Sequence, residues 1–351
     1  MRGNIYLEET LESCKAAFPR FEHVFINEEK LRAVAEENAL KGFLLPRWDY
    51  AGVQPQDNNV FISYCFWWNV INFCFDYSSR MGDGQLVKFA ATDVNGREQR
   101  GAYAMEACLY KTFGEKTILA EDILGSFRDY SNFAECFRGR TELPLLRERW
   151  EYLLMSAEIL SELFDGDPRN ILEKGKFSAF GDDNENGIIP LILFHFPTFE
   201  DSFRDSGRGK FFGFPGLSFW FYKRAQLFVL MYHGRASQSD GKLTPISDIN
   251  CLGPIPDYEL PKSYAADGIF TYGEELQDCV IRALPILRHG KMEIEIRAAT
   301  VWCQIKELKI MNAIRFREGC PLLHIGHVDY YRWKRGRESS ANHHLCYTTD
   351  Y

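Results

Sequence analysis

The chain of 351 residues lacks several features that mark common classes of protein. Its ten cysteines contain no Cys-x-x-Cys pair, and its eight histidines are scattered without a helical His/Glu pairing such as His-Glu-x-x-His, which argues against a zinc or redox centre. No apolar run of membrane-spanning length and no basic-then-apolar N-terminal segment is visible. We therefore expect a protein of the reducing cytoplasm, without disulfide bonds and without a membrane span.

Positive charge is not in excess either. Lys and Arg number 41 against 49 Asp and Glu, which gives a net charge of -8. Proteins that bind nucleic acid over a long footprint usually present a basic face, so we expect no extensive nucleic-acid interface. A pocket for one nucleotide remains compatible with this charge. The chain shows no internal repeat and no segment that resembles an interdomain linker, so we predict a single domain over residues 1–351.

What the sequence does have is helical periodicity. Two apolar stripes recur every three or four residues: Leu146, Trp150, Leu153, Ala157, Leu160 and Phe164 form the first, and Ile294, Ala298, Val301, Ile305, Leu308 and Met311 form the second. The turn sequence at 93–96 separates two segments, 86–91 and 99–104, which together indicate a β-hairpin. We predict a mainly α-helical protein with a small β element near residues 84–104.

Two adjacent cations, Lys223 and Arg224, stand in the aromatic run 219–227, which we expect to be helical. On a helix, Lys223 shares a face with Leu227 and Leu230, so its ammonium group is predicted to approach the interior. The alternative is a lysine whose stem packs while its charged end reaches water. Arg224 points elsewhere and is expected to form a surface or structural ion pair.

Asp257 lies in a loop that Pro254 and Pro256 stiffen, just before a predicted helix whose first turn contains Pro261. The residue can simply cap that helix. The backbone donors of a helix N-terminus would also keep its carboxylate ionised. An ionised carboxylate in a dry pocket is suited to stabilise an oxocarbenium-like transition state or to activate water.

Two further clusters combine aromatic rings with polar side chains. The run 61–75 contains Asn69 and Asn72 among tryptophans and phenylalanines, and it is either buried core or an aromatic wall that stacks a heterocycle. Near the C-terminus, Asp329 precedes Tyr330 and Trp333. Its carboxylate could accept hydrogen bonds from the N–H edge of a guanine-like base, although a surface helix with one Asp would look the same.

Taken in order, these segments resemble the queuosine salvage family, the queuosine 5′-phosphate N-glycosylase/hydrolases. The resemblance extends from about residue 20 to the C-terminus. It rests on the segments Asn72-Phe-Cys-Phe75, Phe196-Pro-Thr-Phe-Glu-Asp201, Phe221-Tyr-Lys-Arg-Ala-Gln226, Asp257-Tyr-Glu-Leu-Pro261, Glu293-Ile-Glu-Ile-Arg297 with Val301-Trp-Cys303, and Asp329-Tyr-Tyr-Arg-Trp333.

The resemblance implies a helical DNA-glycosylase-like fold and the release of queuine from queuosine 5′-monophosphate by N-glycosidic hydrolysis. In that scheme Asp257 is the catalytic aspartate and Lys223 the active-site lysine, either paired with it or in contact with substrate. Asp329 and Tyr330 hold the deazaguanine base, and Trp333 is expected beside them. No cofactor and no metal are expected, and we expect a monomer.

The sequence departs from the family pattern around the substrate. Lys334 stands where the family has an Asp, Ile255 where it has an aromatic residue, and Tyr50 near an expected histidine. Asn69 falls where the family often shows an Asp. All four are predicted to shape substrate binding. Alternatives are therefore another 7-deazaguanine nucleoside, a base within nucleic acid, or a non-catalytic deazaguanine-binding protein. Candidates for binding a 5′-phosphate are Lys223, Arg224 and Lys262.

Overall fold

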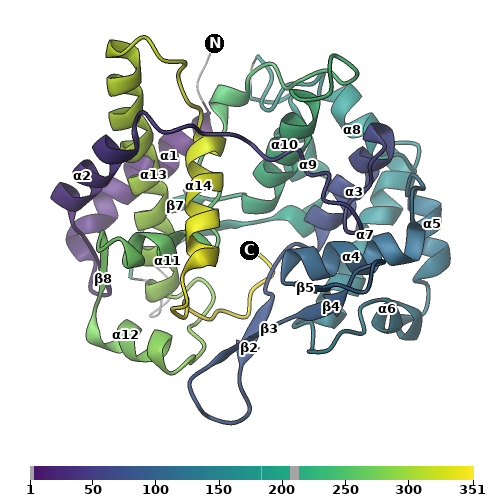
Figure 1. Ribbon diagram of the computed structural model, residues 1–351, viewed down its shortest axis with the longest axis horizontal. Coiled ribbons are helices and arrows are strands. Elements are labelled where there is room, and N and C mark those ends of the chain that lie inside the picture. Colours follow the sequence, from purple (N-terminus) through teal and green to yellow (C-terminus); the bar gives the residue numbers. More distant parts are fainter. Residues whose placement is uncertain (1–3, 183, 206–212) are drawn as a thin grey trace.

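Helices dominate the computed structural model, which describes residues 4–182, 184–205 and 213–351 (Figure 1). The α-helices of this described part are α1 (Ile5–Ala17), α2 (Glu28–Asn38), α3 (Asn58–Val70), α4 (Ala102–Phe113), α5 (Ala120–Ser126), α6 (Tyr130–Cys136), α7 (Leu146–Leu163), α8 (Arg169–Lys174), α9 (Ile188–His195), α10 (Lys223–Ala236), α11 (Glu259–Ala266), α12 (Glu274–Ile281), α13 (Lys291–Arg317) and α14 (Ile325–Glu338). Short 3-10 helices occupy Phe18–Arg20, Pro197–Phe199 and Ile249–Cys251. Among these helices, none combines the length and apolar character needed to cross a membrane.

The strands are short and pair two by two, always antiparallel. The pairs are β1 (Val24–Ile26) with β8 (Phe270–Tyr272), β2 (Asp76–Ser78) with β3 (Leu86–Lys88), β4 (Ala90–Thr92) with β5 (Glu98–Arg100), and β6 (Ser202–Arg204) with β7 (Ser218–Trp220). The predicted mainly α-helical class is confirmed. The finer prediction of a DNA-glycosylase-like arrangement stays a prediction.

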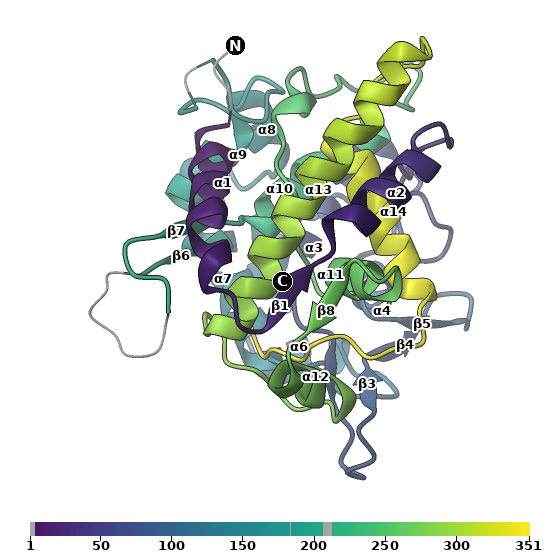
Figure 2. The same cartoon turned by 90° about the vertical axis from the view of Figure 1, so that its left-hand side faces the viewer.

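Both predicted apolar stripes lie on helices, α7 and α13. Helix α13 is 27 residues long and runs through the molecule with α1, α2 and α14 packed beside it (Figure 2). Its residues Ile294, Ala298 and Val301 are buried in one hydrophobic cluster together with Phe219 and Phe221. The regular three-to-four spacing of those residues is what lets one face of a long helix serve as a packing surface.

The predicted hairpin around 93–96 is present as β4 and β5, whose register pairs Ala91 with Gln99. The prediction was wrong at both ends. Residues 86–88 form β3, which pairs with β2 instead, and residues 102–104 begin α4. Gly101 separates β5 from α4 with a φ of 62°, a conformation that glycine adopts without a steric penalty.

The prediction of a helix over 219–227 was wrong in its first half. Residues 218–220 form β7, whose backbone hydrogen bonds go to β6. Tyr222 has a φ of 47°, in the left-handed region, and this turn redirects the chain so that α10 begins at Lys223. Asp201 anchors the turn: its carbonyl accepts the N–H groups of Phe221 and Tyr222, and its carboxylate accepts that of Lys223 at 2.9 Å.

Helices α11 and α14 make one of the closest helix pairs in the structure, and Gly336 on α14 permits it. A Cβ at position 336 would overlap the carbonyl group of Glu259 at the start of α11. The close approach matters because α11 follows the loop that carries Asp257, whereas α14 carries Asp329. Gly336 therefore helps to set how these two carboxylates face one another.

Candidate active site

A pocket opens where α4, α10, α14 and the loop before α11 meet. It encloses about 650 Å³ of space, counted out to the solvent at its mouth. Its lining combines rings, aliphatic side chains, three acidic side chains and one lysine: Trp48, Asn72, Ala102, Tyr103, Glu106, Lys223, Leu227, Leu230, Met231, Ile255, Asp257, Asp329, Tyr330 and Trp333. The pocket thus brings together seven of the residues that the sequence indicated as catalytic or substrate-binding, drawn from widely separated segments: Asn72, Lys223, Ile255, Asp257, Asp329, Tyr330 and Trp333.

Lys223, the first residue of α10, is only 4% exposed. It lines the pocket together with Leu227 and Leu230, as the predicted helix face requires, so its charged end does not reach bulk solvent. Its Nζ donates to the backbone carbonyl of Asn72 at 3.2 Å and to the side-chain oxygen of the same residue at 3.4 Å. Burial lowers the pKa of Lys223 to about 8, although the attraction of Asp257 opposes the change.

Asp257 lies two residues before α11, and its Oδ1 accepts the N–H of Glu259 at 2.8 Å. The surface that Asp257 exposes faces the pocket. Burial raises the pKa of this carboxyl group, while Lys223 and the backbone donors of α11 act in the opposite direction. The backbone donors thus act in the direction expected from the sequence, but the loss of water around the carboxyl group has the larger effect on its pKa.

Lys223 and Asp257 do not form a direct ion pair in the described structure, although each is close enough to shift the pKa of the other. Both groups instead face the same space. This geometry differs from that of a structural salt bridge, because the two groups line one pocket without direct contact. Both charged groups therefore remain available to interact with a ligand in the pocket.

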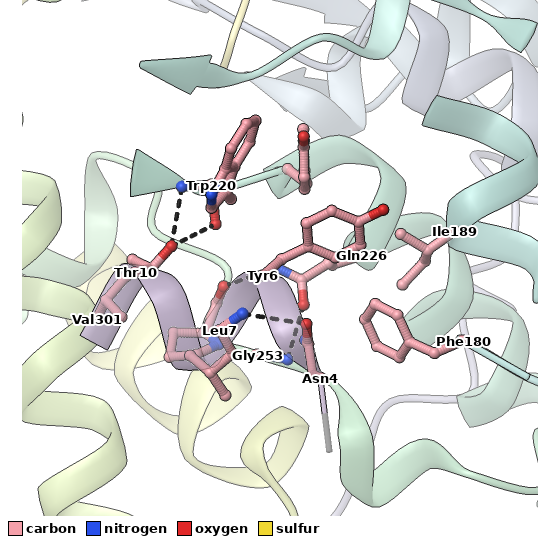
Figure 3. Close-up of a pocket in the computed structure, with 12 residues that line it drawn as sticks. Asn4, Tyr6, Leu7, Thr10, Phe180, Ile189, Trp220, Gln226, Gly253 and Val301 are labelled. Carbon is pink, nitrogen blue, oxygen red and sulfur yellow. Dashed lines mark hydrogen bonds between the residues drawn. The ribbon is translucent and has the colours of Figure 1, made fainter. Parts of the chain in front are cut away.

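Gln226 connects the two elements that carry these charges (Figure 3). From α10, its side-chain nitrogen donates to the carbonyl of Pro254 at 3.0 Å, and its oxygen accepts the N–H of Gly253 at 2.7 Å. The loop that ends at Asp257 is therefore bonded to the helix that begins at Lys223. Figure 3 shows this contact at the edge of a second, narrower pocket between α1 and α10.

Asp329 enters the pocket from α14 and is 6% exposed. Gln304 on α13 donates to its Oδ1 at 3.2 Å. Burial, followed by repulsion from Asp257, raises the pKa of Asp329 to about 8, and the backbone amide of Ile255 partly opposes this shift. Ile255 therefore acts on the site through its main chain as well as by lining the pocket.

Aromatic rings form the wall around these groups. Tyr330 and Trp333 stack with their centroids 5.8 Å apart and their planes 20° apart. Trp48 lies 6.4 Å from Tyr330, and the ring of Tyr103 stands edge-on to Trp333 at 6.2 Å. Flat apolar surfaces of this kind suit a planar heterocycle, since its faces stack on rings while its edge reaches polar atoms.

Three residues predicted to bind substrate lie outside this lining. Lys334 is exposed on the solvent side of α14. Asn69 is buried beneath the pocket, where its amide donates to the carbonyl of Cys65 at 2.8 Å. Tyr50 is 48% exposed, and its ring packs against Tyr103, with the centroids 5.9 Å apart. Lys334 is directed away because its neighbours Trp333 and Asp329 occupy the inward face of α14.

Two further predictions about cations need correction. Arg224 makes no surface or structural ion pair in the described residues. It is fully buried, and its guanidinium donates to the backbone carbonyls of Val70 at 2.8 Å and of Thr198. Lys262 forms an ion pair with Glu259 at 2.7 Å. Of the three candidates for binding phosphate, only Lys223 lines the pocket.

Three lining residues were not predicted from the sequence: Trp48, Tyr103 and Glu106. Trp48 lies in a coil segment without a motif, and its indole packs where Gly234 on α10 leaves room, since a Cβ there would overlap the ring. Glu106 did have a signal: it is the one charged residue in the apolar stretch 102–109. A single charge in a buried helix face requires compensation, and this could have marked the residue as a candidate.

The fold and pocket define a helical protein with buried ionisable groups arranged around a site for a flat small molecule. The chain belongs to the queuosine salvage protein family, whose sequence model matches residues 53–349. A relative named queuosine 5′-phosphate N-glycosylase/hydrolase, from Sphaerobacter thermophilus, is 26% identical over 318 residues, which cover 91% of this chain and 89% of the relative. A protein of the same name from Mus musculus is 24% identical over 282 residues, covering 79% and 76%.

Proposed function

We propose that this protein hydrolyses the N-glycosidic bond of queuosine 5′-monophosphate and releases the base queuine. The observation that supports the proposal best is the arrangement of Lys223, Asp257 and Asp329 around one aromatic-walled pocket, where none of the three forms a direct ion pair with another described residue. The family membership and the printed names of the relatives point to the same reaction. No step of it calls for a cofactor or a metal.

In the proposed reaction, Asp257 faces the ribose. As the bond to the base breaks, positive charge develops on the sugar ring, and the carboxylate stabilises it or orients the attacking water. Lys223 lowers the pKa of Asp257 and thereby favours the ionised form that this role requires. The bound substrate supplies the opposite charges: its phosphate faces Lys223, and the positive charge that develops on its ribose faces Asp257.

We propose that Asp329 binds the edge of the base while Tyr330 and Trp333 hold its faces. A guanine-like edge offers two N–H donors, and hydrogen bonds to an ionised carboxylate lower its pKa. The arriving base therefore shifts Asp329 from the neutral form, favoured in the free pocket, to the accepting form. This coupling makes base recognition depend on the donor pattern of the edge.

The 5′-phosphate is proposed to lie in a side compartment that adjoins the main pocket. Asn72, Lys223 and Asp257 line both spaces, and Arg337 lines the side compartment. Lys88 also lines it, but this lysine already forms ion pairs with Asp76 and Glu259. We therefore assign the phosphate to Lys223 and Arg337. A single cytoplasmic domain that acts as a monomer completes the proposal.

The test is incubation of the protein with queuosine 5′-monophosphate, followed by chromatographic detection of free queuine. Wild type is expected to release the base. Asp257→Asn should lower the rate by at least ~10²-fold, the scale seen when a preorganised charge-stabilising group is removed, while keeping the fold by circular dichroism. Asp278→Asn makes the same chemical change on the exposed part of α12 and should leave the rate unchanged.

Three results would contradict the proposal in different ways. A folded Asp257→Asn protein with full activity would refute the assigned mechanism. Release of a base only from other 7-deazaguanine nucleosides or from modified oligonucleotides would retain the chemistry and change the substrate. Binding of queuosine 5′-monophosphate by calorimetry without any base release would identify a non-catalytic binding protein.

A further inference from the structure

Glu106 is a buried acid in the pocket that the proposed reaction does not use. It lies on α4 and is 3% exposed, yet it lines the same space as Lys223 and Asp329. In the described part of the chain, no lysine, arginine or histidine forms an ion pair with it. A buried carboxyl group without a cationic partner is costly to ionise. Its place in a ligand pocket raises the question of which group compensates it.

The neighbours of Glu106 fix which of its two oxygens is available. The backbone N–H of Tyr50 donates to Oε1 of Gln54 at 3.0 Å, so the amide nitrogen of Gln54 must point the other way. That nitrogen donates to Oε2 of Glu106 at 2.7 Å. Because Oε2 already accepts a hydrogen bond, Oε1 is the oxygen left to carry a proton or to meet a ligand.

The surroundings of Glu106 favour its neutral form in the free protein. Burial raises its pKa to about 8, opposed by the hydrogen bond from Gln54 and by the attraction of Arg337. Other titratable neighbours are Tyr103 on α4 and Cys65 on α3, neither of which supplies a positive charge. Arg337 itself lies over the rings of Tyr103 and Trp333. A ligand cation would therefore be the main partner of this acid.

We infer that Glu106 recognises a positively charged substituent of the base and thereby selects a cationic 7-deazaguanine over an uncharged one. The inference rests on the proposed function. Queuosine carries a secondary amine on the substituent of its deazaguanine ring, and this amine is an ammonium ion near neutral pH. When it binds, the proton on Oε1 leaves to solvent, and a carboxylate–ammonium pair forms inside the pocket.

The test compares two substrates and two variants. The substrates are queuosine 5′-monophosphate and 7-deazaguanosine 5′-monophosphate, which lacks the amine. Glu106→Gln keeps the size and the bond to Gln54 but cannot ionise. Glu106→Gln should lower kcat/KM for queuosine 5′-monophosphate at least tenfold, mainly by raising KM. It should change kcat/KM for 7-deazaguanosine 5′-monophosphate less than twofold. Glu121→Gln, the same change at an exposed position on α5, should alter neither.

A second measurement separates recognition from a structural role. Calorimetry of queuosine 5′-monophosphate binding, in buffers of different ionisation enthalpy at pH 7, counts the protons released. In an Asp257→Asn background, which prevents turnover, adding Glu106→Gln should reduce that count by about one proton, because only the acid can give one up. A residue that merely supports the fold would leave the count unchanged.

The outcomes keep the inference and the proposed function apart. If wild type releases queuine and Glu106→Gln loses activity equally on both substrates, the inference fails and the reaction stands. If the protein binds queuosine 5′-monophosphate with Glu106-dependent proton release but never releases a base, the reaction fails and the inference stands. Failure to bind either nucleotide would overturn both.

Discussion

Two buried charged regions of this molecule lie on the same helix, α14, and are built in opposite ways. Where α11, α13 and α14 meet, Arg332 is fully buried and paired on both sides. Its guanidinium donates to the carboxylate of Glu307 at 2.7 and 2.9 Å and to Asp267 at 2.6 Å. One turn earlier, Asp329 faces a pocket in which no such direct pair is made.

The difference is visible in the pKa directions. Burial alone would raise the pKa of Asp267, yet the bonds from Arg335 and Arg332 lower it. In the pocket, burial prevails and raises the pKa of Asp257 and Asp329. Completed ion pairs fix the helices in place, whereas incomplete ones leave charge for a ligand to balance. The contrast yields four predictions.

The largest effect is expected from breaking the paired region. Arg332→Met leaves Glu307 and Asp267 buried without their common partner, which should lower the free energy of unfolding by ~3–5 kcal/mol in urea titrations. Arg282→Met is the matched control, because Arg282 pairs with Asp278 at the surface and should cost under ~1 kcal/mol. If the two variants lose similar amounts of unfolding free energy, the buried ion pairs of Arg332 stabilise the protein no more than the surface ion pair of Arg282 does.

Lys223→Met tests the unpaired region in the same way. The substitution removes a buried cation that lacks a direct ionic partner, so stability should stay the same or rise. Base release should nevertheless fall by ~10²-fold or more, because Asp257 loses the charge that favours its ionised form. The rate of base release and the free energy of unfolding in urea are measured on the same preparation of the variant. A loss of stability as large as that of Arg332→Met would erase the distinction.

The pH dependence sharpens the comparison further. The pKa of Lys223 is lowered from 10.5 to about 8, so its protonated form is lost as the pH rises through about 8. We expect kcat/KM to fall above that pH, by up to tenfold per pH unit. In Lys223→Arg the decline should move to higher pH. A decline that remains near pH 8 in the variant would show that Lys223 is not the group responsible, and titration of Asp329 would not explain it, because the ionised form of Asp329 that accepts hydrogen bonds becomes more populated as the pH rises.

The smallest effect is expected at Lys334. It departs from the family pattern, but it is exposed and does not line the pocket. Lys334→Ala should change kcat/KM less than threefold and the free energy of unfolding by under ~0.5 kcal/mol. A tenfold change in KM would mean that the solvent side of α14 approaches the substrate after all.

The sequence predicted those parts of the fold that depend on local pattern. The stripes of α7 and α13 were found because residues spaced three and four apart share a helix face whatever surrounds them. The helix predicted over 219–227 failed because aromatic composition does not distinguish strand from helix. There the pairing of β7 with β6 and the left-handed Tyr222 decide the conformation.

The site was predicted unevenly for a related reason. Asp257, Lys223 and Asp329 lie in segments that match a family motif, so their order along the chain located them. Trp48 and Glu106 have no such motif, and their roles arise from contacts across 50 residues or more, such as that of Gln54 with Glu106 and of Trp48 with Gly234. Single-sequence patterns contain no information about contacts of that range.

Gly336 shows how little steric tolerance the pocket has at one point. Because the backbone of α11 fills the space where a Cβ would project, a single methyl group at position 336 would act as a spacer between α11 and α14. It would move Asp257 and Asp329 apart without touching either residue. A substitution at position 336 would therefore alter the spacing of these two carboxyl groups, although Gly336 does not line the pocket itself.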